Sequence, residues 1–262
     1  MVQELTAISG KNDIERQPDF IIIGAQKCGT TSLYQYLIEH PQILPASQKE
    51  VHFFDLNFAQ GVDWYKQQFP TVSQGLITGE ASPYYIFHPL VAQRVYELFP
   101  QVKLIALLRN PVERAISHYY HEVRLGFENL GLEDAIAQES ARLKGETAKM
   151  LADATYYSYN HQHYTYLSRG IYVEQLKHWM QFFPKEQFLI LPSEELYNQP
   201  NQVLNQVLDF LELPSYQLTQ YDKYNSGEYP EINPGIRQQL QAYFQPYNQQ
   251  LEEFLGVKFE WE

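Results

Sequence analysis

The segment 24–32 carries the densest set of groups suited to binding an anion. It reads Gly-Ala-Gln-Lys-Cys-Gly-Thr-Thr-Ser and stands between an apolar run and a stretch with the spacing of a helix. A glycine-containing turn between a buried strand and a helix presents backbone N–H groups and the positive end of the helix dipole to a ligand. We therefore expect a phosphate-binding loop, whose binding residues are Lys27, Cys28, Gly29, Thr30, Thr31 and Ser32.

The loop differs at one position from the phosphate loop of nucleotide kinases. Gly24 and Gly29 have the spacing of the pattern Gly-x-x-x-x-Gly-Lys-Ser/Thr, but Thr30 stands where that pattern has its lysine. The cation is instead Lys27, inside the loop, and no second carboxylate is evident that would complete a magnesium site. The pattern favours a nucleotide with one 5′-phosphate that carries a transferable group, handled without a metal. A P-loop nucleotide kinase stays open as an alternative.

The elements that must position this loop follow an alternating pattern. Buried strands are predicted from apolar runs at 20–24, 102–108 and 188–191. Apolar residues at helical spacing predict helices at 31–40, 172–183, 200–211 and 234–255, and Pro41 ends the first of them. A further helix is predicted from 110 onward, because Asn110 and Pro111 are typical of a helix start. Strands that alternate with helices predict an α/β fold with a parallel sheet and right-handed crossovers.

The rest of the chain suggests one domain with a short lead. Residues 1–17 are polar and aperiodic, and we interpret them as a flexible N-terminal lead or linker before a single domain at 18–262. Within that domain, the segment 126–168 breaks the alternation, because it is polar at first and then rich in Tyr and His. It is either an insertion that forms an active-site lid or a pair of surface helices.

Composition and charge exclude several classes of protein. The 262 residues contain 19 Lys and Arg against 31 Asp and Glu, a net charge of −12, which argues against a nucleic-acid binder and a polyanionic substrate. No run of roughly 18 apolar residues and no secretory signal is visible, so no membrane span is expected. The single cysteine fits a reducing compartment, and we expect a cytoplasmic monomer or weak oligomer. No metal is predicted, because no common site has the spacings of His118, His121, His161 and His163.

Three further segments carry recognisable motifs: Lys-Glu-Val-His-Phe-Phe-Asp at 49–55, Gly-Glu-Ala-Ser-Pro-Tyr at 79–84 and Leu-Arg-Asn-Pro-Val-Glu-Arg-Ala-Ile-Ser at 108–117. Together with 18–33 they resemble sulfotransferases that use 3′-phosphoadenosine 5′-phosphosulfate (PAPS), in particular the heparan-type and bacterial branch. The likeness runs from about residue 18 to the end of the chain. It implies a P-loop-like three-layer fold, with a central parallel sheet flanked by helices. It also implies a metal-independent transfer of a sulfuryl group from PAPS to an acceptor hydroxyl, releasing PAP.

The resemblance implies roles for the residues that hold the nucleotide. Lys27 stabilises the charge that grows on the leaving phosphate, and Arg109 with Ser117 holds the 3′-phosphate. Elementary geometry agrees, because Arg109 would follow a strand at the edge where α/β ligands bind, and Ser117 would lie about two helical turns further on. The matching loop near the C-terminus has no Lys or Arg, but its Ser226 and Gly227 are expected to contact the nucleotide.

The resemblance also implies the acid–base groups. Glu50 matches the general base of the heparan-type enzymes. His52 would point to the same side of an extended segment, and it either orients the acceptor or is itself the base. Asp55 is expected to support one of these side chains. Many heparan-type enzymes have a lysine where this chain has Ala81, and whether Lys49 replaces that cation stays open.

The acceptor is the least constrained part of the interpretation. The likeness includes free-standing bacterial enzymes and sulfotransferase domains of modular polyketide synthases, which sulfate the β-hydroxyl of a carrier-bound acyl chain. An acyl carrier protein-bound 3-hydroxyacyl chain is therefore one predicted acceptor, and a small free alcohol or a carbohydrate is the alternative. The short basic run of Arg142, Lys144 and Lys149 either docks such a carrier or is a solvated helix face. A non-catalytic nucleotide-binding protein is the remaining alternative class.

Overall fold

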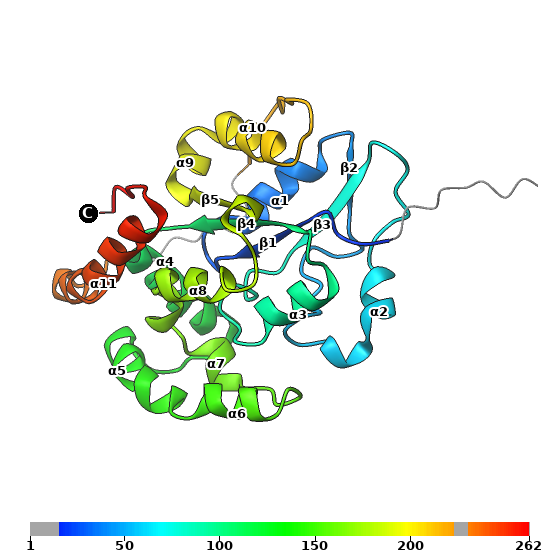
Figure 1. The fold of residues 1–262 in the computed structure, drawn as a ribbon. Helices are drawn as coiled ribbons and strands as arrows, with labels where there is room; N and C mark the ends of the chain where they lie inside the picture. Colours follow the sequence, from blue (N-terminus) through cyan, green and yellow to red (C-terminus); the bar gives the residue numbers. More distant parts are fainter. Residues whose placement is uncertain (1–15, 223–229, 262) are drawn as a thin grey trace, which may run out of the picture.

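The computed structural model describes residues 16–222 and 230–261, so Ser226 and Gly227 lie outside the described residues. Within these ranges a sheet of five strands forms the centre, in the order β2-β3-β1-β4-β5, and every neighbouring pair is parallel (Figure 1). The strands are β1 Phe20–Gly24, β2 Ile43–Pro45, β3 Ile77–Ala81, β4 Lys103–Leu108 and β5 Phe188–Pro192. The predicted parallel sheet and its three predicted strands are confirmed.

Two strands are not evident from the sequence pattern. β2 has three residues, and β3 reads Ile-Thr-Gly-Glu-Ala, with a glycine and a glutamate where a buried strand usually has apolar residues. Both exceptions have a physical reason. A Cβ at Gly79 would stand 2.4 Å from the carbonyl oxygen of Phe20 on β1, so the close approach of the two strands requires glycine. The glutamate, Glu80, is fully buried but hydrogen-bonded.

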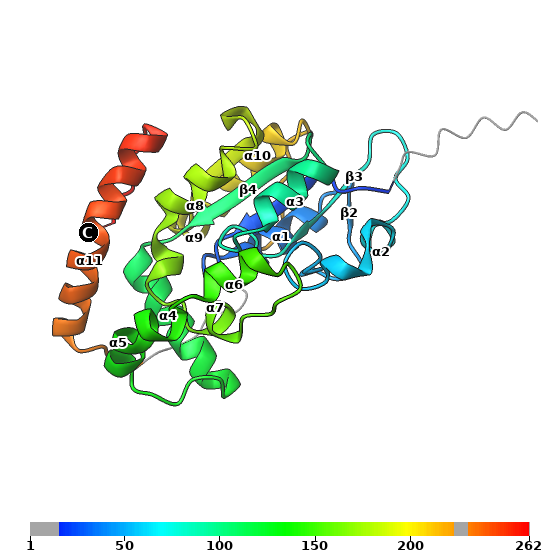
Figure 2. The same ribbon diagram turned by 60° about the horizontal axis from the view of Figure 1, so that its bottom comes forward.

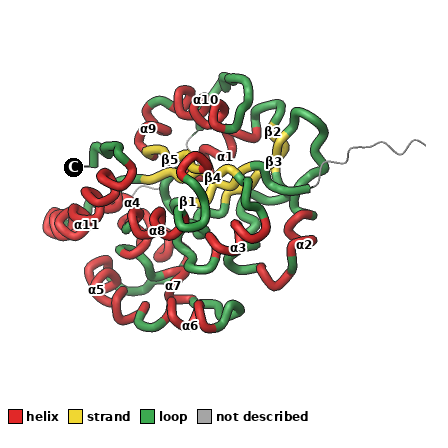
Figure 3. The backbone as a smooth tube through the Cα atoms, in the orientation of Figure 1, coloured by secondary structure: helices red, strands yellow, loops and turns green. Residues whose placement is uncertain are grey.

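Helices cover both faces of the sheet, as the resemblance implies. α1, α9 and α10 lie on one face, α3 and α8 lie on the other, and α11 packs against α4 and α8 (Figures 1 and 3). The α-helices are α1 Thr30–Ile38, α2 Val62–Lys66, α3 Val91–Leu98, α4 Pro111–Leu125, α5 Leu132–Leu143, α6 Glu146–Ala152, α7 Tyr159–His163, α8 Tyr172–Trp179, α9 Ser193–Asn198, α10 Pro200–Phe210 and α11 Pro234–Leu255. Short 3₁₀ helices are η1 Phe58–Gln60, η2 Ser168–Gly170 and η3 Lys185–Gln187. All five predicted helices are present, and α11 has the predicted bounds.

The strand order brings the phosphate loop beside the start of α4. β1 and β4 are neighbours, so the chain leaves both strands at the same edge of the sheet. The Ala25 N–H, just after β1, donates to the Leu107 carbonyl of β4 at 2.8 Å. At the head of α4, the Asn110 side chain accepts from the Val112 N–H at 2.9 Å and Pro111 opens the helix, which confirms the predicted N-cap.

The segment 126–168 contains the helices α5, α6 and α7, which lie beyond α8 on one side of the molecule (Figures 1 and 2). The buried carboxylate of Glu139 in α5 accepts hydrogen bonds from the N–H groups of Leu167 at 2.6 Å and Ser168 at 2.8 Å. These bonds tie the end of the segment back to its first helix. The segment has three α-helices, and both the lid and the surface-helix interpretations stay predictions.

Glu80 on β3 is the polar centre of the core. Its carboxylate accepts four hydrogen bonds, from the Ser82 hydroxyl at 2.6 Å, the Tyr85 hydroxyl at 2.9 Å, the Tyr65 hydroxyl at 3.0 Å and the Val51 N–H at 3.2 Å. Burial raises the pKa of Glu80 to about 7, against the lowering effect of these donors. The four bonds hold the loop that follows residue 50 against the sheet.

Two buried tyrosines test how firmly Glu80 fixes this loop. Tyr65→Phe removes one donor to Glu80, and we expect the free energy of unfolding to fall by about 1 kcal/mol. Tyr85→Phe removes a donor and also strands the Phe53 N–H, which donates to the Tyr85 hydroxyl at 2.8 Å. Because a buried unsatisfied N–H costs about 1–3 kcal/mol more, Tyr85→Phe should be the more damaging change. Urea unfolding measures both variants, and equal losses would contradict this account.

Candidate active site

A cavity of about 720 Å³ lies where the chain leaves β1 and β4. Its lining includes eight of the residues that the sequence predicts for the site: Lys27, Gly29, Thr30, Thr31, Glu50, His52, Arg109 and Ser117. The side chains of Cys28 and Ser32 are fully buried, and neither residue belongs to the lining. The fold thus joins segments that are distant in the sequence into one site.

The loop between β1 and α1 has the shape of an anion cradle. Gly29 has a φ of 88°, and a Cβ there would stand 2.9 Å from the Tyr197 hydroxyl, so this position requires glycine. Lys27 lines the cavity from the middle of the loop. Burial, together with the nearby charges of Arg124 and Arg109, lowers the pKa of Lys27 to about 8. An anion bound here would offset that repulsion and favour the protonated lysine.

Arg109 and Ser117 supply a second set of donors to the same cavity. The Arg109 guanidinium donates to the Lys27 carbonyl at 3.4 Å, which connects it to the phosphate loop. It also lies 3.9 Å from the carboxylate of Glu113. Ser117 is almost fully buried on α4 and faces the cavity. The arrangement suits a ligand that carries two separate anionic groups.

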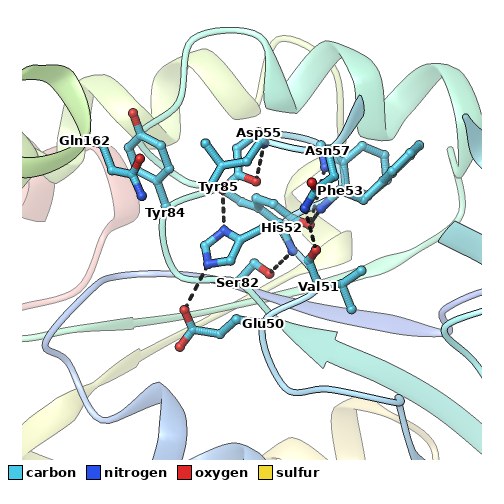
Figure 4. Close-up of polar contacts among 12 residues, drawn as sticks. Glu50, Val51, His52, Phe53, Asp55, Asn57, Ser82, Tyr84, Tyr85 and Gln162 are labelled. Atoms are coloured by element: carbon cyan, nitrogen blue, oxygen red, sulfur yellow. Dashed lines mark hydrogen bonds and ion pairs between the residues drawn. The ribbon is translucent and has the colours of Figure 1, made fainter. Parts of the chain in front are cut away.

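Glu50, His52 and Asp55 form a chain of contacts in the wall of the cavity (Figure 4). The His52 Nε2 lies 3.2 Å from the Glu50 Oε2, and the His52 Nδ1 lies 2.8 Å from the Asp55 Oδ2. Burial alone would lower the pKa of His52, but the two carboxylates outweigh it and raise that pKa to about 10. Burial alone would raise the pKa of Glu50, but His52 and Lys49 outweigh it and lower that pKa to about 2. An ionised Glu50 beside a protonated His52 favours Glu50 as the proton acceptor.

The backbone that brings these side chains together differs from the prediction. His52 has a φ of 51°, in the left-handed region, and its carbonyl accepts from the N–H groups of Leu56 at 3.2 Å and Asn57 at 2.9 Å. The prediction of an extended segment is therefore wrong, although Glu50 and His52 do meet. The His52 N–H donates to the Ser82 hydroxyl at 3.1 Å, which fixes this turn to the end of β3.

Lys49 links the phosphate loop to Glu50. Its ammonium group donates to the Thr31 hydroxyl at 3.0 Å and pairs with the Glu50 carboxylate. The Lys49 carbonyl accepts from the Ala81 N–H at 3.0 Å, so Lys49 lies beside the position where many heparan-type enzymes have a lysine. This geometry favours the interpretation that Lys49 supplies the cation that Ala81 lacks.

The sequence analysis assigned no role to the rest of the cavity lining, of which only Gln26, Pro83 and Tyr84 lie within the quoted motifs. The other residues of this lining are His121, Glu122, Leu125, Phe127, Gln162, His163, Arg169 and Tyr197. Spacing held a signal for two of them, because His121 and Leu125 follow Ser117 by four and eight positions and share its side of α4. The residues from 162 to 169 gave no signal, since their approach depends on how the preceding helices pack.

Arg169 fixes this second wall to the phosphate loop. It is almost fully buried, and it donates to the side chain of Gln26 and to the carbonyls of His161 at 3.1 Å and Gln162 at 2.8 Å. Its guanidinium also lies 4.8 Å from the centre of the Tyr84 ring. The charge of Arg169 is therefore engaged within the protein.

The histidines near the cavity have partners in the chain. The His161 Nδ1 lies 2.6 Å from the Tyr84 hydroxyl, and the His118 Nε2 and His163 Nδ1 lie 3.2 Å and 2.8 Å from the Glu122 carboxylate. Over residues 16–222 and 230–261, no group of three or more His, Cys, Asp or Glu residues is arranged to hold a metal ion. Nor does any helix in the described part of the chain combine the length and the apolar character that crossing a membrane requires.

Comparison with known proteins places this site in a family. A family model described as a sulfotransferase domain matches residues 17–245. The chain is 28% identical over 313 residues to the membrane-associated sulfotransferase kil1 of Dictyostelium discoideum, covering 94% of this chain and 66% of that protein. It is 30% identical over 273 residues to heparan sulfate glucosamine 3-O-sulfotransferase 5 of Mus musculus, covering 95% and 75%. A crystal structure of a sulfotransferase from Alicyclobacillus acidocaldarius matches with a TM-score of 0.77 and 31% identity, covering 93% of this chain and 97% of that one.

Because folding raises the pKa of His52, we expect the free energy of unfolding to depend on this residue at alkaline pH. A histidine whose pKa is raised by folding stabilises the native state below its unfolded value of 6.5, and that stabilisation is lost as the pH rises through about 10. We expect the difference in unfolding free energy between the wild type and His52→Gln to shrink by on the order of 2 kcal/mol between pH 6.5 and 10. Water reaches the imidazole, which is 24% exposed, so the change should be smaller than a dry site would give.

Urea unfolding of both proteins at several pH values measures this difference. Taking the difference between the two proteins cancels the titration of other groups, including Lys27, whose lowered pKa acts in the opposite direction. A difference that stays constant from pH 6.5 to 10 would show that His52 is not held as a cation between the two carboxylates.

Proposed function

We propose that this chain, which belongs to the sulfotransferase domain family, transfers a sulfuryl group from PAPS to an acceptor hydroxyl and releases PAP. One observation carries the proposal. A single cavity joins two sets of anion-binding groups, around Lys27 and Arg109, to an ionised carboxylate, Glu50, that is positioned by His52. The two cationic sets fit a nucleotide with phosphates at two positions, and the carboxylate fits the removal of a proton from an alcohol.

The residues around the first set fit the donor end of PAPS. Gly29 packs closely against Tyr197, and Thr30 and Thr31 at the N-terminus of α1 line the cavity beside it. Lys27 and the backbone of this loop would hold the 5′-phosphosulfate, and Arg109 with Ser117 would hold the 3′-phosphate. PAPS supplies the sulfuryl group and a phosphate leaving group.

The protein contributes charge and position to the transfer. Glu50 takes the proton of the acceptor hydroxyl, while Lys27 stabilises the charge that develops on the leaving oxygen. Lys49, between Thr31 and Glu50, lies where it can serve both ends of the reaction. His52 positions Glu50, and Asp55 keeps His52 protonated and oriented.

We propose a carrier-bound 3-hydroxyacyl chain as the acceptor, with a small free alcohol or a carbohydrate as the alternative. The relative from Mus musculus is named for sulfation of a glucosamine hydroxyl in heparan sulfate, which supports a hydroxyl acceptor of some kind. Two cations of the basic run are bound within the chain, because Arg142 pairs with Glu128 at 2.5 Å and Lys149 pairs with Glu146 at 2.7 Å. A carrier protein would therefore have to dock on another surface, because Arg142 and Lys149 are already paired within the chain.

Nucleotide binding tests the donor. We expect PAP to bind without Mg²⁺ and more tightly than AMP or ATP in calorimetric titrations. Arg109→Met should weaken PAP about 10- to 100-fold and leave AMP unchanged, because a hydrogen bond to a charged group is worth about 1.5–3 kcal/mol and AMP has no 3′-phosphate. Equal losses for PAP and AMP would remove the role given to Arg109. A preference for ATP with Mg²⁺ would instead revive the nucleotide kinase.

The catalytic groups make a second prediction. Glu50→Gln should lower kcat about 10²- to 10⁴-fold with PAP affinity unchanged, because it removes the base and preserves the shape. Lys27→Met should lower kcat about 10²- to 10³-fold. Initial rates with PAPS and the most active member of an alcohol panel measure both, and Lys258→Met, at an exposed position outside the cavity lining, is the matched control. Wild-type turnover by Glu50→Gln would contradict the assignment, and PAP binding with no turnover in the wild type would favour the non-catalytic alternative.

A further inference from the structure

Helix α4 divides the cavity into two ends of different character. Ser117, His121, Glu122 and Leu125 all line the cavity, and at about 1.5 Å per residue Leu125 lies about 12 Å further along the axis than Ser117. The end near Ser117 holds the donor-binding cations described above. The other end has a wall that we call the acceptor wall, formed by His121, Glu122, Leu125, Phe127, Gln162 and His163.

Glu122 gives the acceptor wall a fixed negative charge. The side chain is 2% exposed, and its two carboxylate oxygens lie 2.8 Å from the His163 Nδ1 and 3.2 Å from the His118 Nε2. Burial alone would raise the pKa of Glu122, but its contacts with these histidines outweigh it and lower the pKa to about 2. The carboxylate is thus ionised at neutral pH while it faces the cavity.

The described residues of the acceptor wall include no lysine or arginine, and the polar contacts of the Glu122 carboxylate are with His163 and His118. Burial lowers the pKa of His121, so the imidazole is neutral, and Arg124 beside it is exposed and outside the lining. The nearby cations Arg169 and His52 are already engaged within the chain, the former by carbonyls and the latter by two carboxylates. Glu50 adds a second ionised carboxylate at the reacting position.

The remaining surface of the wall is apolar or accepts hydrogen bonds. Leu125 is 50% exposed and Phe127 is 38% exposed at the cavity, where large apolar side chains are costly to leave in water. The side-chain oxygen of Gln162 is buried and has no hydrogen-bond donor in the part of the chain that the structure describes. Figure 4 shows Gln162 and Tyr84 together, to one side of His52. Such a wall suits a hydroxyl donor with an apolar neighbour.

We propose that the acceptor wall selects an uncharged alcohol with an apolar portion beside the reacting hydroxyl, and that Glu122 excludes alcohols with an anionic group at that place. This inference rests on the proposed function and deepens it. A carboxylate or sulfate on the acceptor would face Glu122 and Glu50 in a confined space, where like charges repel strongly. The same charge pattern attracts the anionic donor to the opposite end of the cavity.

Matched alcohols that differ in one anionic group test this inference without requiring turnover. The pairs are methyl 3-hydroxyoctanoate against 3-hydroxyoctanoate, and octyl glucoside against octyl glucuronide. Calorimetry measures the binding of each alcohol to the full chain saturated with PAP. We expect the uncharged member of each pair to bind at least tenfold more tightly, and the ratio to fall several-fold in Glu122→Gln. Glu133→Gln removes one exposed carboxylate of α5 and should leave the ratio unchanged.

A second variant protects the test against misfolding of Glu122→Gln. Leu125→Lys adds a cation at a half-exposed position of the wall, and it should shift the preference toward the anionic member of each pair. Three results would overturn the inference in a protein that still binds PAP. They are equal binding of both members of a pair, an unchanged ratio in both the Glu122→Gln and Leu125→Lys variants, and no binding of any uncharged alcohol. Failure of PAP itself to bind would overturn the proposed function as well.

Discussion

The buried carboxylate of Glu80 is the contact on which the geometry of the site depends. A carboxyl group without exposure to water is costly unless its oxygens are hydrogen-bonded, and here four donors converge on it. Two of those donors also accept hydrogen bonds: the Ser82 hydroxyl accepts from the His52 N–H, and the Tyr85 hydroxyl accepts from the Phe53 N–H. The backbone of the turn around His52 is therefore fixed from inside the core, and His52 keeps a φ of 51° that a bulky residue seldom adopts.

The second constraint is the parallel order of the sheet, which concentrates charge of opposite sign at the two ends of one cavity. Because β1 and β4 are neighbours, Lys27 and Arg109 leave the sheet side by side, and their mutual repulsion contributes to the lowered pKa of Lys27. Glu50 and Glu122 line the same cavity, and histidine contacts lower the pKa of each, with Lys49 also acting on Glu50. An anionic donor relieves the repulsion at one end, whereas an uncharged alcohol avoids repulsion at the other.

The sequence alone predicts those elements whose structure depends on residues close together in the chain. The apolar run of β1, the N-cap at Asn110 and the spacing of α11 each have a cause within a few residues, and each is confirmed. β3 escaped detection because Gly79 and Glu80 are explained only by contacts with other segments, namely Phe20 and the turn after Glu50. The acceptor wall escaped for the same reason, since it comes from α4 and from the packing of α5 to α7. The family motifs supplied the residues proposed for the donor site and for the general base, but a motif records no pKa.

A carboxylate with a pKa near 2 is a weak base, so Glu50, the proposed proton acceptor, would become a stronger base if its pKa rose. The His52 hydrogen bond lowers that pKa most, and the charge of Lys49 comes next. The Lys49 ammonium group is shared between Glu50 and the Thr31 hydroxyl of the phosphate loop. An anion bound in the loop competes with Glu50 for that ammonium group. To the extent that Lys49 turns toward the anion, Glu50 loses a stabilising cation and its pKa rises. In the proposed mechanism, the contact between Lys49 and Glu50 would thus couple binding of the donor to the strength of the base.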